Sequence, residues 1–210
     1  MGARNLTIVV VDNEIKVAQY GQYGGYPEAN GLAVKRFIGK IAEHSDEISK
    51  FRNACRNCRF ITDDELNEKY KEAGIDPEDE SGMTLRQLNT FEAMYPALKK
   101  DASAEVLQLI LDNGGCELWD AIEFAADSFL CEWACLINLD TESVEIYKGF
   151  NREPLAKDDR FYMYMDRFLT TSEGLDHLYF PIRKILEIPF KELSEMSDDK
   201  FLEMFTGNDD

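Results

Sequence analysis

A short basic segment contains the side chains best suited to bind an anion. If residues 50–59 form a helix, Arg52, Arg56 and Arg59 stand at positions i, i+4 and i+7 and share one face. Guanidinium groups form paired hydrogen bonds with phosphate and carboxylate groups. The spacing therefore predicts an anion-binding face. The alternative is a solvated face whose arginines pair with the many carboxylates of the chain.

A glycine- and tyrosine-rich segment, residues 18–27, is the second candidate site. Glycine amides and the start of a following helix can hold a phosphate, while tyrosine rings stack on a base and glutamine amides bond its edge. The candidate ligand-binding residues of this segment are Gln19, Tyr20, Gln22, Tyr23 and Tyr26. Arg4, Lys35 and Arg36 are the nearby candidates for neutralising phosphate. Neither a P-loop nor a dinucleotide-binding fingerprint is present, and the alternative is a bulged strand end whose tyrosines pack on the core.

The cysteines and carboxylates suggest no catalytic or metal centre. Cys55 and Cys58 have the spacing of a zinc or redox pair, but no second C-x-x-C motif completes a site. The odd count of five cysteines favours reduced, structural thiols. No spacing of aspartates or glutamates singles out a catalytic pair. We therefore predict no catalytic residues, no metal and no cofactor.

The charge is distributed unevenly along the chain. The 210 residues include 41 acidic and 23 basic side chains and carry a formal charge of −18, yet residues 1–60 hold nine basic against six acidic ones. Long polyanions such as nucleic acid are repelled by such a protein, whereas a compact anion is not. No apolar run approaches the roughly 18 residues of a membrane span, and the first residues show no leader pattern. We expect a cytoplasmic protein that contacts neither nucleic acid nor membrane.

The expected fold is a single α+β domain covering residues 1–210. Two hairpins, at about residues 5–20 and 132–150, and a C-terminal strand within 179–190 are expected to form an antiparallel sheet. A first helix is expected to open at Asn30-Gly31. A helical insertion of about residues 45–128 separates the hairpins, and an acidic helix is expected over 191–205. This arrangement brings the two hairpins together in space.

Both hairpin regions resemble a family of small proteins carried by bacteriophages and prophages. Residues 1–27 include MGARNLTIVVVD and IKVAQYGQYGGYP, similar to the family pattern MGTRNLT…YKVAQYGQWDGYP, and residues 131–150 read CEWACLINLDTESVEIYKGF. The resemblance spans most of the chain, although Ala3 replaces Thr and Tyr23-Gly24 replaces Trp-Asp. It implies a phage context, in the cytoplasm of a host cell, and assigns no activity.

Three functions follow as hypotheses. The first is a non-enzymatic phage accessory protein that antagonises host antiviral defence, by sequestering a small nucleotide-type immune signal or by binding a host defence protein. The second is a hydrolase, because the start of the chain also resembles N-terminal-nucleophile hydrolases; Gly2-Ala3-Arg4 stands where they carry Cys-Thr-Arg, so the nucleophile is missing. The third is an acidic nucleic-acid mimic that blocks a defence nuclease. A homo-oligomer is compatible with sequestration, but no sequence feature demonstrates one.

Overall fold

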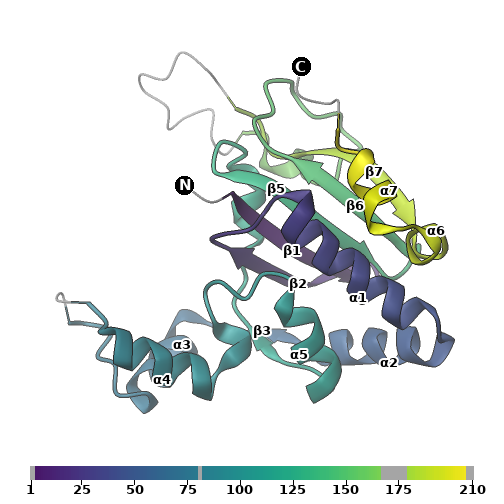
Figure 1. Cartoon of the computed structure of the whole chain (residues 1–210). Helices are drawn as coiled ribbons and strands as arrows, with labels where there is room; N and C mark the ends of the chain where they lie inside the picture. The colour runs from purple at the N-terminus through teal and green to yellow at the C-terminus, as the bar shows by residue number, and fades with distance from the viewer. Residues whose placement is uncertain (1–2, 80–81, 167–178, 207–210) are drawn as a thin grey trace.

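The computed structural model describes residues 3–79, 82–166 and 179–206. It has the expected mixed α and β composition, and its main sheet contains five strands in the order β2-β1-β5-β6-β7 (Figure 1). These strands are β1 (Arg4–Val11), β2 (Glu14–Gly21), β5 (Cys131–Asn138), β6 (Ser143–Lys148) and β7 (Arg183–Pro189). The sheet is mostly antiparallel, and the pairing of β1 with β5 is the parallel exception. Because β1 and β5 are parallel, both strands begin at the same end of the sheet.

The central position of β1 explains its continuous apolar sequence. Leu6, Ile8 and Val10 contribute to the core on one face of the sheet, while Val9 and Val11 contribute to the core on the other. A strand buried on both faces has no solvated side, so a run of β-branched residues replaces the alternating pattern of a half-exposed strand.

Helices pack on one face of the sheet and share its core (Figure 1). They are α1 (Leu32–Ala42), α2 (Ser45–Arg56), α5 (Glu105–Asn113), α6 (Phe190–Glu195) and α7 (Asp198–Glu203). The opposite face is covered by a 3-10 turn at Ile122–Ala126 and by the buried side chains of Phe161 and Ile182. No helix within the described ranges is long and apolar enough to cross a membrane.

The remaining helices, α3 (Asp63–Glu72) and α4 (Leu85–Met94), project away from the sheet (Figure 1). They enclose a small apolar cluster of their own, built around Ile75 and Phe91. Capping boxes start both helices, at Thr62 and at Thr84. Of the segment expected as a helical insertion, α2 and α5 thus pack on the main core, whereas α3 and α4 do not. The short strands β3 (Arg59–Phe60) and β4 (Glu117–Leu118) pair in parallel and connect the two parts.

Two helix boundaries differ from the sequence-based expectation. The helix expected over 191–205 is two short helices, because Met196 has an extended backbone and the Ser197 hydroxyl caps α7 by accepting from the Lys200 amide. The helix expected to open at Asn30 begins at Leu32, after a single π turn at Pro27–Gly31. The Asn30 side chain is buried and donates to the Thr7 hydroxyl across 3.2 Å.

Candidate functional site

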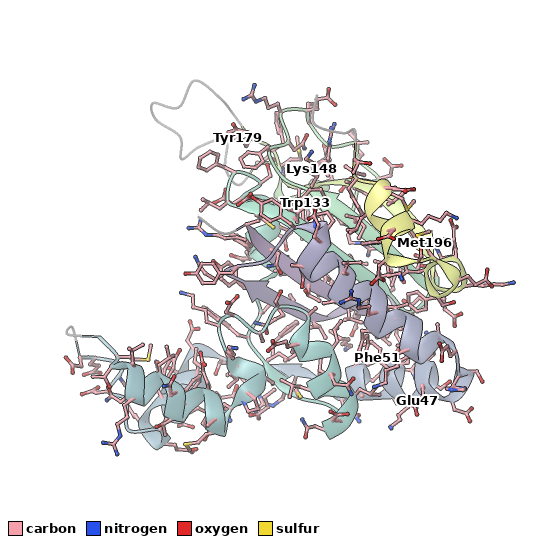
Figure 2. All side chains as sticks on the ribbon, in the orientation of Figure 1. Glu47, Phe51, Trp133, Lys148, Tyr179 and Met196 are labelled. Atoms are coloured by element: carbon pink, nitrogen blue, oxygen red, sulfur yellow. The ribbon has the colours of Figure 1, made fainter. Side chains whose placement is uncertain are left out.

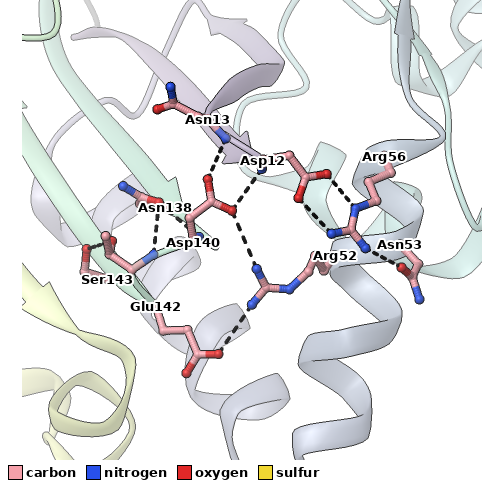
Figure 3. A network of polar contacts seen from close by, with 10 residues as sticks. Asp12, Asn13, Arg52, Asn53, Arg56, Asn138, Asp140, Glu142 and Ser143 are labelled. Carbon is pink, nitrogen blue, oxygen red and sulfur yellow. Dashed lines mark hydrogen bonds and ion pairs between the residues drawn. The ribbon is translucent and has the colours of Figure 1, made fainter.

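The arginines predicted to bind an anion are already paired with carboxylates. Arg56 donates two hydrogen bonds to Asp12 across 2.7 and 2.8 Å, while Arg52 lies 3.7 Å from Asp140 and 3.4 Å from Glu142 (Figure 3). The hydrogen bond from Arg56 lowers the pKa of Asp12. Arg59 lies outside the helix, in β3, and pairs with Glu65 and Glu117. The three arginines do not share one face, and the interpretation with carboxylate partners describes them.

The paired arginines join the two hairpin turns. The Asp140 carboxylate accepts hydrogen bonds from the backbone amides of Asp12 and Asn13 across 2.9 and 2.7 Å (Figure 3). Because β1 and β5 are parallel neighbours, their following turns lie side by side, and Arg52 and Arg56 of α2 bind both turns. The network therefore fixes the sheet against α2.

Lys35 and Arg36 serve a similar structural purpose at α7. Both donate to the carboxylate of Asp198, Lys35 across 2.7 Å to Oδ1 and Arg36 across 2.7 Å to Oδ2. These hydrogen bonds lower the pKa of Asp198. The two basic residues hold α7 on α1.

The glycine- and tyrosine-rich segment turns most of its polar groups inward. Gln19 is buried and donates to the carbonyls of Tyr20 and Lys99, and the Tyr20 hydroxyl donates to the Gln22 side chain across 2.5 Å. The Tyr20 ring packs edge-on against Phe124, 5.0 Å between centroids. Tyr23 and Tyr26 are exposed, and of these two Tyr26 lines the cavity described below.

Close contacts with the start of β1 explain two glycines of this segment, Gly21 and Gly25. The Asn5 side chain lies across Gly21, where an added Cβ would be 2.5 Å from the Asn5 amide nitrogen, and that nitrogen donates to the Tyr23 carbonyl across 3.1 Å. At Gly25 a Cβ would be 2.8 Å from the Ala3 carbonyl oxygen, to which the Gly25 amide donates. The segment is thereby held against the start of β1.

We expect Gly25→Ala to destabilise the protein by about 1–3 kcal/mol, because the new methyl group overlaps two backbone carbonyls that cannot rotate away. Urea denaturation of the variant measures this loss. Gly74→Ala is a comparison variant without a close contact. Gly74 has a positive φ of 76° and open space around an added Cβ, so this substitution measures only the backbone strain of an alanine at positive φ. An unchanged midpoint for Gly25→Ala would contradict the close approach.

A large open cavity lies at the end of the sheet where β1 and β5 begin. Its volume is about 1090 Å³, and its walls come from the turn around Tyr26, the ends of β5, β6 and β7, and Phe205, which follows α7. Figure 2 shows Trp133 and Lys148 close together at this end of the sheet. The lining residues that combine aromatic and basic character are Tyr26, Trp133, Lys148, Phe150, Arg152, Arg183, Lys184 and Phe205.

Strand register places an aromatic ring and two cations in one row across this cavity. Trp133 of β5 is opposite Lys148 of β6, and Lys148 is opposite Arg183 of β7. Residues opposite one another in paired strands project from the same face. The Lys148 ammonium lies 5.6 Å from the centroid of the Trp133 ring, within the range of a cation–π contact. We call Trp133, Lys148 and Arg183 the cross-strand row.

The turn after β6 adds a second aromatic group. Phe150 has a positive φ of 52° and is 47% exposed, although its amide is fixed by the Ser128 carbonyl across 2.7 Å. Its ring packs near Phe129 and Tyr179, at 6.2 and 6.1 Å between centroids. Gly149 precedes it and packs so closely that a Cβ would be 2.2 Å from the Cys131 carbonyl oxygen. A phenylalanine held in this conformation and left exposed is typical of a binding surface.

The local charge of the cavity contrasts with that of the whole protein. Four basic and three acidic side chains line it, whereas the chain as a whole carries −18. The acidic lining residues are Glu28, Glu132 and Glu153. Arg183 contacts Glu153 across 3.3 Å, and both side chains are at least half exposed. Such a surface ion pair contributes little stability, so Arg183 can leave Glu153 and bind an anion of higher charge.

Sequence reasoning predicted Tyr26 but missed the other members of the cavity. Arg4 begins β1 opposite Cys131. Burial raises the pKa of Tyr20, and the charge of Arg4 partly opposes this rise. The signal for part of the row was present, because counting back from the turn of the second hairpin places Trp133 opposite Lys148. Arg183 carried no such signal.

The thiols are free and buried, apart from the half-buried Cys116. Burial raises the pKa of Cys58 to about 11 and that of Cys135 to about 12, so these side chains remain protonated near neutral pH. Within residues 3–79, 82–166 and 179–206, no group of three or more His, Cys, Asp or Glu side chains is placed to hold a metal ion. Gly2, the position of the missing nucleophile, lies outside the described residues.

Comparison of the chain with family models, with curated proteins and with solved structures finds no match. The cavity and its cross-strand row are therefore the features from which a function is inferred.

Proposed function

We propose that the cavity binds a small, nucleotide-type anion and that the protein sequesters this ligand. The observation that carries the proposal is the cross-strand row, in which an aromatic ring and two cations lie on one face of a rigid sheet. Binding pockets of about 300–1,000 Å³ hold drug-sized ligands, so the volume here is sufficient for a nucleotide. Together with the resemblance to phage proteins, this supports an accessory protein that removes an immune signal in the cytoplasm of the host.

The chemistry of the lining suits both halves of a nucleotide. Aromatic rings bind bases of any type, because each base has a π face. Trp133 and Tyr26 supply such rings, while Lys148 and Arg183 supply donors for phosphate oxygens. Charge-assisted hydrogen bonds to phosphate are stronger than those between neutral groups. The strongly acidic remainder of the surface repels long polyanions and leaves a compact anion as the ligand.

Incubating the purified protein with a panel of small nucleotides tests the proposal. The panel contains mononucleotides, cyclic mono- and dinucleotides and ADP-ribose derivatives; after gel filtration the protein is denatured by heat and the released ligand is identified. We expect at least one nucleotide to be retained and released intact, as sequestration requires. Release of a chemically altered product would instead support the hydrolase hypothesis.

A matched pair of variants identifies the site. Lys148→Gln removes a cation from the cavity and is expected to lose retention, whereas Arg56→Gln removes a cation that binds Asp12 on the hairpin turn and is expected to retain the ligand. If no member of the panel is retained by the unmodified protein, the proposed function is wrong. If Arg56→Gln alone loses the ligand, the site has been misplaced.

A further inference from the structure

We infer that the cross-strand row recognises a nucleoside diphosphate group, and not a monophosphate. This inference rests on the proposed function, because it specifies the ligand of the same cavity. Its basis is the order of the row: one aromatic residue followed by two cations on consecutive strands. Neighbouring strands lie about 4.7–4.9 Å apart, so the second cation is attached one strand spacing beyond the first.

This order corresponds to the order of groups in a nucleoside diphosphate. A base stacked on Trp133 is followed by its sugar and its first phosphate, which is beside Lys148, and a second phosphate then extends towards Arg183. The Lys148 ammonium lies over the Trp133 ring, 5.6 Å from its centroid, and is therefore close to a base that binds this ring. We expect a monophosphate to contact Lys148, and a second phosphate to be needed for contact with Arg183.

The pairing of Arg183 is compatible with this assignment. Its partner Glu153 is 80% exposed at the side chain and lies 3.3 Å away, which is a surface ion pair of small net stability. A terminal phosphate offers more charge and several acceptor oxygens, and a guanidinium can bind two of them at once. The second phosphate can therefore displace Glu153 from Arg183.

The remaining cations of the cavity are less suited to the second phosphate. Lys184 is opposite Tyr147 and bonded to Glu187 across 2.7 Å, so its strand position is on the other face of the sheet. Arg152 lies over the Tyr179 ring, 5.7 Å from its centroid, in the turn beyond the sheet. Arg183 is the cation that continues the row.

Titration with adenosine, AMP, ADP and inorganic pyrophosphate tests the inference. In a Trp119→Phe background, Trp133 is the sole tryptophan and its fluorescence reports binding. We expect ADP to bind about tenfold to a hundredfold more tightly than AMP, the gain typical of an added charged hydrogen bond. Pyrophosphate, which lacks a base, is expected to bind more weakly than ADP.

Variants separate the two cations. Arg183→Gln is expected to weaken ADP binding at least tenfold while leaving AMP binding within twofold, whereas Lys148→Gln weakens both nucleotides. Arg56→Gln, outside the cavity, is the control and changes neither. Equal affinities for AMP and ADP, or an equal effect of Arg183→Gln on both, would overturn the diphosphate assignment and leave the proposed function intact. Absence of binding by every nucleotide here and in the wider panel would overturn both.

Discussion

Trp133→Ala is expected to weaken nucleotide binding about 5- to 150-fold, because stacking of a base on an aromatic side chain contributes about 1–3 kcal/mol. The alanine also removes the surface beside which the Lys148 ammonium lies, so the cation loses its fixed position. Isothermal titration calorimetry measures the loss, since the variant lacks the fluorescent reporter. Trp133→Phe keeps a smaller ring and is expected to lose less affinity than the alanine variant.

The second tryptophan of the chain provides the control. Trp119 is 42% exposed and lines a different hollow, with Tyr20 and Phe124, so Trp119→Ala should leave nucleotide affinity unchanged. Trp133 also packs edge-on against Phe205, 5.9 Å between centroids, and its removal therefore affects stability as well. Binding is compared only under conditions where urea denaturation shows both variants to be folded. Equal affinity of Trp133→Ala and the unmodified protein would exclude the ring as the stacking surface.

Sequence patterns predicted the elements that bear the site better than the site itself. The apolar run beginning at Leu6 and the turn residues around Asp140 are local signals, and both correspond to observed elements. The partners of the arginines were not predictable in detail, because Asp12 and Arg56 are 44 residues apart and meet only when α2 packs beside the hairpin turns. The arginine spacing is compatible with an anion site and with ion pairs, and the tertiary structure places carboxylates beside these arginines.

Arg183 shows why the rest of the cavity could not be predicted. Its place in the row depends on a register shift between Ile146 and Tyr147, where β7 contains one additional residue. A shift of one residue moves every side chain of a strand to the opposite face, so no periodicity within β7 alone assigns Arg183 to this cavity. The glycine-rich segment illustrates a different difficulty: Gly21 and Gly25 pack closely against Asn5 and Ala3, contacts that the sequence pattern alone did not indicate.

Arg160→Met is expected to lower the free energy of unfolding by about 3 kcal/mol, the lower end of the range for breaking a buried ion pair. Glu145 of β6 is 5% exposed at its side chain, and the Arg160 guanidinium binds it across 2.9 Å. Tyr147 donates its hydroxyl to the same carboxylate across 2.5 Å, and burial together with this hydrogen bond raises the pKa of Tyr147. Without Arg160, the buried Glu145 carboxylate keeps, among the described residues, only neutral hydrogen-bond donors, Tyr147 and Asn138, and the charge of Lys184 is the remaining positive influence. Urea denaturation near neutral pH measures the loss.

A double variant shows whether the loss arises from the uncompensated charge. Glu145→Gln combined with Arg160→Met removes the carboxylate charge and is expected to be more stable than Arg160→Met alone, because a neutral amide is less costly to bury. Arg86→Met on the exposed surface of α4 is the matched control and should change stability by no more than about 0.5 kcal/mol. If the double variant is as unstable as Arg160→Met, packing of the arginine stem explains the loss, and the buried charge does not. Since Arg160 contacts β6 on the face opposite the cross-strand row, nucleotide affinity is expected to survive in each variant that remains folded.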